Sequence, residues 1–282
     1  MPALAQMGPP RQFTAPEVKL VDPGLEPRKQ LRYDTVLDAG QKDLESFEVE
    51  AGGWWYVDAI SGQATRVFPV IKTPIKAARG LSGFAVELGA STTIEQPDGG
   101  FPDQGMLEVL KGMDGVAGWI PTDNRGAMLG LMIHPGTKDE KFAGNHRTVE
   151  MRSAMGMEVA RGLLTRLTVP FPVEAIGKKA KWDVRRYVVR GQIQYDELAH
   201  FELVDFSKGV ATVKITFGGA LLADGPYAAG DLELKVDGTG EAKVDLKRPL
   251  PLSWNDSVDL DILLNVSKAR QKGHLTTHEQ LR

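Results

Sequence analysis

Apolar and polar residues alternate along several stretches in the second half of the chain. In Val210–Phe217, alanine, valine, isoleucine and phenylalanine occupy every second position, with threonine and lysine between them. The same period of two recurs in Leu232–Val236, Ala242–Leu246 and Val258–Val266. Alternation of this kind is typical of antiparallel strands that have one buried face and one wet face.

Shorter strand-like runs occur in the first half of the chain. Leu44–Glu50 alternates phenylalanine and valine with glutamate. Trp54–Ile60 and Arg66–Ile71 are separated by a short serine-glycine turn, so they are predicted to form a hairpin. Val116–Pro121 and Met128–His134 are predicted to form a second hairpin.

One long segment has a helical period instead. Between Asn145 and Leu167, apolar residues recur at steps of three and four, which places them on one face of a helix. Pro170 and Pro172 follow and are expected to end the helix, because proline lacks an N–H donor. The apolar positions are Val149, Met155, Val159, Leu163, Leu164 and Leu167.

These patterns predict an α+β fold that is mostly β, with a strongly curved antiparallel sheet packed around one central amphipathic helix. The expected units are a proline-rich extended arm (1–27), a first β unit (28–144), the helix (145–169), a second β unit that shares the same core (170–266) and a loose polar tail (267–282).

A weak internal similarity links the two β units. Val116–Pro135 consists of a strand, a glycine turn, a second strand and a proline, and Asp231–Pro249 has the same order if Gly238-Thr239-Gly240 is a turn. Either any β-meander produces such similarity, or the chain contains two similar β-meanders from a duplication.

Composition and net charge exclude several classes of protein. The 282 residues are 42% hydrophobic and 25% charged, which is near the globular average, so a real core is expected. The net charge of −3 argues against a general nucleic-acid binder. No apolar run approaches the ~18 residues that a membrane-spanning helix needs. The absence of cysteine excludes disulfides, thiol catalysis and cysteine-ligated metal sites.

The first residues carry a hint of export. Ala3-Leu4-Ala5 has the small-x-small form of a signal-peptidase site, with Gln6 as the residue after it. We therefore expect an exported protein, periplasmic or at the cell surface, whose signal peptide is removed before Gln6. A chance match is the alternative, because no apolar or basic region precedes the motif.

No catalytic motif is evident, so the chain is expected to be neither an enzyme nor a cofactor-dependent or metal-dependent protein. The nucleophile elbow, the phosphate-binding loop and the zinc-protease signature are all absent. His274 and His278 would share one face of a helix, but they fall in the predicted tail and are expected to be solvated. A carboxylate-based enzyme stays open as an alternative, because such sites leave little trace in one sequence.

Aromatic and methionine residues are the candidates for ligand binding. Trp54 and Trp55 are adjacent, so they point to opposite faces of one strand, and Trp119 stands in another strand. Met151 and Met155 add soft, adaptable surface to the helix. Core packing is expected to explain most of these residues, and a ligand cavity or partner surface is the more specific hypothesis.

A basic run extends from Lys178 to Arg190 and includes Lys181, Arg185 and Arg186. A solvated outer face of a strand is the expected reading, with the side-chain stems packed on the sheet. Contact with anionic lipid or with an acidic partner is the alternative.

Two short segments resemble an uncharacterised family of secreted bacterial proteins and lipoproteins, known as a domain of unknown function. Ile176-Gly177, Ala180 and Trp182 match its Val/Ile-Gly-x-x-Ala-x-Trp phrase, which follows a helix and opens a strand. Leu31-Arg32-Tyr33 is similar to the strand that opens such proteins. The resemblance implies export and β-architecture, and it implies no functional residues. The overall plan is also similar to periplasmic lipoprotein carriers and lipid-binding proteins.

The sequence thus leads to a non-enzymatic bacterial envelope protein that binds an apolar ligand, such as a lipid, or another envelope protein. The alternative is a structural subunit of a surface assembly that uses its N-terminal arm.

Overall fold

The computed structural model describes residues 15–34, 45–59, 62–80, 83–88, 93–95, 112–135, 157, 160, 164, 168–190, 193–221, 232–248, 250–264 and 269–281. In parts of some strands, such as 53–59, the description covers the backbone alone.

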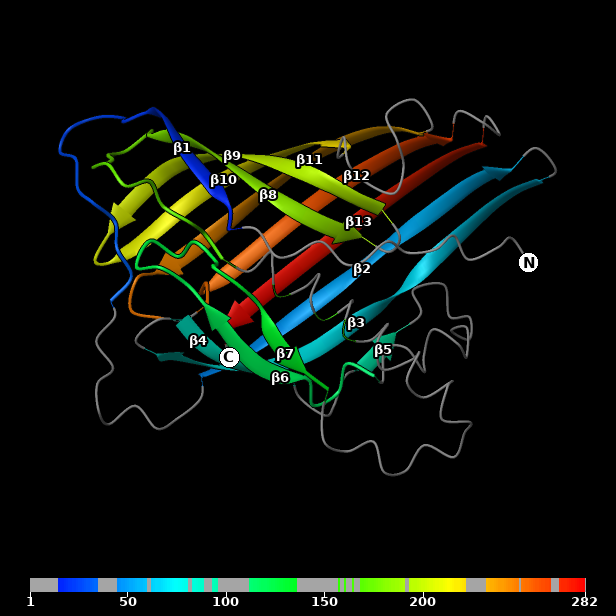
Figure 1. Cartoon of the computed structure of the whole chain (residues 1–282), viewed down its shortest axis with the longest axis horizontal. Helices are drawn as coiled ribbons and strands as arrows, with labels where there is room; N and C mark the ends of the chain where they lie inside the picture. The colour runs from blue at the N-terminus through cyan, green and yellow to red at the C-terminus, as the bar shows by residue number, and fades with distance from the viewer. Residues whose placement is uncertain are drawn as a thin grey trace.

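The described residues form one 13-stranded sheet in which every paired strand is antiparallel (Figure 1). The order of neighbours is β1-β8-β9-β10-β11-β12-β13-β2-β3-β4-β6-β7, and β5 pairs with β3. The prediction of a mostly β, antiparallel protein is confirmed. The strands are β1 (Glu17–Asp22), β2 (Glu45–Ala59), β3 (Gly62–Gly80), β4 (Gly83–Leu88), β5 (Thr93–Glu95), β6 (Ala117–Pro121), β7 (Met132–His134), β8 (Lys181–Arg190), β9 (Ile193–Ser207), β10 (Val210–Leu221), β11 (Leu232–Asp245), β12 (Ser253–Leu264) and β13 (Ala269–Leu281).

The predicted loose tail at 267–282 is wrong, because most of it is the strand β13 in the interior of the sheet. β13 pairs with β12 on one side and with β2 on the other. Its inward positions include Gly273, Thr277 and Glu279, which are buried but not hydrophobic. The strand therefore lacks the apolar alternation from which the other strands were predicted.

The predicted turn at Gly238-Thr239-Gly240 is also wrong. β11 runs through these residues without a break and pairs with both β10 and β12. A Cβ at Gly238 would lie 2.7 Å from the backbone oxygen of Ser257, and one at Gly240 would lie 2.9 Å from that of Asn255. The glycines serve close strand packing rather than a turn. The internal similarity loses its basis, because the second hairpin does not exist.

Both hairpins predicted in the first half are present. β2 and β3 pair from Ala59 and Gly62 onward, and β6 pairs with β7. The separate runs predicted at Leu44–Glu50 and Trp54–Ile60 are one continuous strand, β2, with a shift in register between Ala51 and Gly53.

Buried side chains lie on one face of the sheet and form two clusters. The first cluster contains inward residues of β8 to β12, with Trp182, Phe201 and Trp254 among its largest members. The second contains residues of β2, β3, β4 and β6, such as Phe47 and Phe84. The opposite face carries cross-strand ion pairs, for example between Lys181 and Glu202.

The segment around Leu31 and Tyr33 is buried without being a strand. Tyr33 donates a hydrogen bond from its hydroxyl to the carbonyl oxygen of Val169 at 3.0 Å, and Arg32 donates to the carbonyl oxygen of Pro172 at 3.0 Å. The strand that the resemblance implies at Leu31–Tyr33 is therefore not formed. Earlier in the chain, the described part of the proline-rich arm forms β1, which pairs with β8 at one end of the sheet.

The predicted helix at 145–169 falls mostly outside the described residues. Met157, Ala160 and Leu164 have helical backbone, and Ala160 and Leu164 are buried in the second cluster. In the described part of the chain, no helix has both the length and the apolar character to cross a membrane.

The glycine packing in β11 makes a testable prediction. We expect Gly238→Ala to lower the free energy of unfolding by about 1–3 kcal/mol, because the added methyl group overpacks the contact with β12. Urea denaturation measures the change. Gly218→Ala in β10 is the matched control. Its Cβ would lie 3.7 Å from the Leu198 oxygen, so this change should be neutral or slightly stabilising. Equal effects at both positions would contradict the continuous strand.

Candidate functional site

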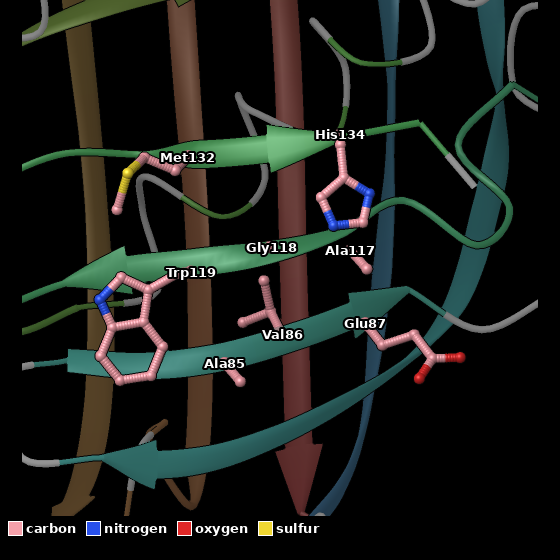
Figure 2. Close-up of a pocket in the computed structure, with 8 residues that line it drawn as sticks. All are labelled: Ala85, Val86, Glu87, Ala117, Gly118, Trp119, Met132 and His134. Carbon is pink, nitrogen blue, oxygen red and sulfur yellow. The ribbon is translucent and has the colours of Figure 1, made fainter. Parts of the chain in front are cut away.

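A shallow open groove of about 490 Å³ lies over strands β4, β6 and β7 (Figure 2). Ala85, Trp119 and Met132 lie opposite one another on the three strands and form one row of its lining. Directly opposite residues of an antiparallel sheet project from the same face. Met132 is 60% exposed and Trp119 is half-buried, so a thioether and an indole ring face solvent together.

The groove lies on the face of these strands that points away from the second cluster. Phe84 and Ile120 point to the other face and are buried in that cluster. The core therefore fixes the position of the strands, and the groove residues are left free to contact a ligand.

Glycine residues let the three strands approach closely. A Cβ at Gly118 would lie only 2.1 Å from the backbone oxygen of Met132, and one at Gly83 would lie 2.2 Å from that of Ile120. Gly83 also has φ of +152°, a conformation that other residues rarely adopt. Side chains at these two positions would force the strands apart and break the floor of the groove.

A second row gives the groove a polar end. Glu87, Ala117 and His134 lie opposite one another, with the carboxylate and the imidazole on either side of the small alanine. Figure 2 shows these two polar side chains at one end of the groove and Trp119 and Met132 at the other. Both polar residues are exposed. The arrangement can receive a molecule with an apolar part and a polar head.

Of the predicted ligand-binding residues, the structure places Trp119 in the groove. Trp54 and Trp55 lie in β2, opposite Val67 and Arg66 of β3, and their side chains lie outside the description. Met151 and Met155 lie outside the described residues. Sequence reasoning missed Met132, Glu87 and His134 as neighbours of Trp119, because only the register of the three strands brings them together.

The histidines predicted to be solvated lie on the outer face of β13. Nδ1 of His274 lies 2.8 Å from the Asp259 carboxylate, and Nδ1 of His278 contacts the Asn255 side chain. On a strand, residues four apart are separated by about 13 Å, which is too far to share one metal ion. Among the described residues, no group of three or more potential metal ligands is present.

The basic run divides between the two faces of β8. Lys181 and Arg185 are exposed, whereas Arg186 points inward and is buried. Nε and Nη2 of Arg186 donate to Oε1 of Glu197 at 2.8 and 2.5 Å. Glu197 is fully buried, so this is an ion pair within the first cluster rather than part of a solvated patch.

The sequence matches no protein-family model and no curated protein. The resemblance of Leu31–Tyr33 and Ile176–Trp182 to an uncharacterised family therefore stays a prediction. In the structure these two segments lie close together, because Lys29, two residues before Leu31, exchanges two backbone hydrogen bonds with Ile176.

The buried ion pair predicts a large difference between single and double substitutions. Arg186→Met should destabilise the fold by about 3–5 kcal/mol, because it leaves the Glu197 carboxylate buried without its cation. The double variant Arg186→Met/Glu197→Met should recover most of that loss. Guanidinium denaturation at neutral pH measures both.

Lys181→Met tests the exposed pair with Glu202 on the same two strands, where the side chains lie 3.9 Å apart in solvent. We expect a loss below about 1 kcal/mol there. A similar loss for both arginine and lysine variants would show that burial of Arg186 has no energetic consequence.

Proposed function

We propose that this chain is a non-enzymatic binding protein of the bacterial envelope, and that the groove over β4, β6 and β7 binds the apolar part of a lipid-like amphiphile. The observation that carries the proposal is the exposed pairing of Trp119 with Met132, on the face of the sheet opposite the core. Exposed aromatic and thioether groups side by side are typical of surfaces that bind ligands.

The size of the apolar contact limits the affinity. Full burial of an exposed large side chain contributes about 1.5–3 kcal/mol. Because Trp119 and Met132 are already partly buried, covering both yields only about 1.5–3 kcal/mol in total, before the entropic cost of binding. A purely apolar ligand would therefore bind weakly. An amphiphile gains further contacts at the polar end of the groove.

The head group would lie over Ala117, between Glu87 and His134. These two residues are separated by two strand spacings, about 9.5 Å between their Cα atoms. The carboxylate accepts hydrogen bonds and attracts a cation, and an imidazole N–H donates to an anion. A zwitterionic head group, with an amine and a phosphate, satisfies both residues.

The central helix belongs to the same proposal. Its support is the helical backbone at Met157, Ala160 and Leu164, whose spacing of three and four places them on one face of a helix. Ala160 and Leu164 are buried with residues of β2, β3 and β4. A helix at 145–169, with the sheet curved around it, would support the groove strands from their buried side.

Envelope localisation draws its support from the Ala3-Leu4-Ala5 motif and from the resemblance at Ile176–Trp182. The alternative, a structural subunit that embraces neighbours with its arm, draws less support. Glu17–Asp22 of that arm is a strand of the chain's own sheet and pairs with β8.

Binding of a single-chain zwitterionic phospholipid, lysophosphatidylethanolamine below its critical micelle concentration, tests the groove. Trp119→Ala should weaken the affinity about 3- to 10-fold, because the half of the indole that the ligand covers corresponds to about 0.7–1.5 kcal/mol. Isothermal titration calorimetry measures the affinity without relying on tryptophan fluorescence.

Two matched variants complete the experiment. Met132→Leu keeps the apolar volume and should bind nearly as well. Lys214→Ala removes an exposed side chain from β10, far along the sheet from the groove, and should bind as the parent protein does. Unchanged affinity in Trp119→Ala, or no heat with the parent protein, would overturn the proposed function.

A further inference from the structure

A buried carboxyl group stands at the junction of the two hydrophobic clusters. Glu279 of β13 lies opposite Trp254 of β12 on one side and opposite Val49 of β2 on the other. Trp254 belongs to the first cluster and Val49 to the second. Glu279 is fully buried, and neither of its carboxyl oxygens has a hydrogen-bond partner in the described part of the chain.

The side-chain donor directly opposite Glu279 is already engaged. Trp254 has a single N–H group, and it donates to Oδ2 of Asp256 at 2.9 Å. The other neighbours of Glu279 on the buried face include Phe47 and Leu281, which offer no side-chain donor, and Thr277, whose hydroxyl does not bond to the Glu279 carboxyl. The glutamate therefore lies on a mostly apolar surface, and the one indole proton opposite it serves another carboxylate.

The charged groups that face this region from the described strands are few and mostly negative. β12 presents Asp256, which is two residues beyond Trp254 on the same face. β2 presents Glu45, four residues before Val49, where Arg248 of the loop before β12 pairs with it at 2.6 Å. No cation of these strands approaches Glu279 closely enough to form a described ion pair.

An ionised carboxylate without partners is costly to bury, whereas a protonated one costs much less. Burial raises the pKa of Glu279 well above its usual range. A group whose folded-state pKa is raised stabilises the fold most below its unfolded pKa. That stability is lost as the pH rises through the folded pKa. Protonation of Glu279 therefore stabilises the packing of β13 between the two clusters.

The position of Glu279 makes local opening easier than global unfolding. It lies two residues before the last residue of β13, Leu281, whose N–H donates to the carbonyl oxygen of Leu252. Separation of Thr277–Leu281 from β12 and β2 would bring the carboxylate to water and break only the last backbone pairings. The rest of β13 remains paired on both sides.

We infer that Glu279 is a proton-controlled latch, which holds the final residues of β13 between the two clusters when protonated and releases them when ionised. Release exposes Trp254, because this ring lies directly opposite the carboxyl group. The latch works independently of the groove, which lies on other strands and on the opposite face.

The test follows solvent access to Trp254 and the stability of the whole chain between about pH 5 and pH 9, on both sides of the ordinary range for a carboxyl group. In the parent protein, acrylamide quenching of tryptophan fluorescence should increase with pH. The equilibrium for opening should shift by up to about tenfold per pH unit over the window where one proton is lost. Glu279→Gln keeps the shape without the ionisation and should remove most of this dependence.

Three further variants make the result specific. Trp254→Phe should remove the fluorescence change but keep the pH dependence of the urea midpoint. Glu241→Gln, on the exposed face of β11, should behave as the parent does. Glu45→Gln measures the smaller contribution of Glu45, whose pKa burial also raises against the effect of Arg248.

Parallel pH profiles for the parent protein and Glu279→Gln would overturn the latch. So would a rise in the melting temperature of the parent protein, but not of Glu279→Gln, on addition of Ca²⁺ at neutral pH. That outcome would make Glu279 a ligand of a bound cation instead.

Discussion

The pairing of β13 with both β12 and β2 is the constraint on which the rest of the structure depends. β12 ends the series of strands from the second half of the sequence, and β2 begins the series from the first half. The backbone hydrogen bonds of one strand therefore join the two halves into a single sheet. Without β13, β12 and β2 would each present a row of unpaired N–H and C=O groups, which is costly and prone to aggregation. β1 and β7, at the two ends of the strand order, are protected in other ways. β1 carries Lys19 and a shift in register before Asp22, and β7 has three residues followed by Pro135.

The two faces of the sheet differ in character: one is buried and mostly apolar, and the other is exposed to solvent and charged. One face holds both hydrophobic clusters, so its residues are chosen by size, and small residues such as Gly238 and Gly240 are needed where bulky rings or backbone approach. The other face is wet and carries ion pairs over β8 to β13. The groove departs from this rule, because β4, β6 and β7 show Trp119 and Met132 on the wet side. Apolar groups on a face that is otherwise charged need an explanation outside folding, and ligand binding supplies one.

Sequence periodicity predicts strands well where the inward residues are large and apolar. Val210–Phe217 was predicted because its inward positions hold Ala211, Val213, Ile215 and Phe217, all of them buried. β13 could not be predicted in this way, because its stability comes from two flanking strands rather than from its own side chains. The turn predicted at Gly238 is wrong for a related reason. A glycine between polar residues predicts a turn locally, but here it meets a requirement for space that only the neighbouring strand reveals. The groove follows the same rule: Trp119 is visible as a candidate in the sequence, whereas Met132 and His134 become its neighbours only through register.

Glu279 is a charged residue on the buried face, and the groove places apolar residues on the exposed face. Departures of this kind from the usual pattern of burial are expected at functional sites. A sheet that needed only stability would have an apolar residue at position 279, since Val49, Trp254 and Leu281 surround it. A glutamate there weakens the junction at every pH above the range in which it is protonated. Because β13 is the strand that pairs with both β12 and β2, even a small change in its final residues alters how tightly the first and second clusters are held together there. The free-energy cost of burying an ionised Glu279 therefore falls on β13, the strand that holds β12 and β2 in one sheet.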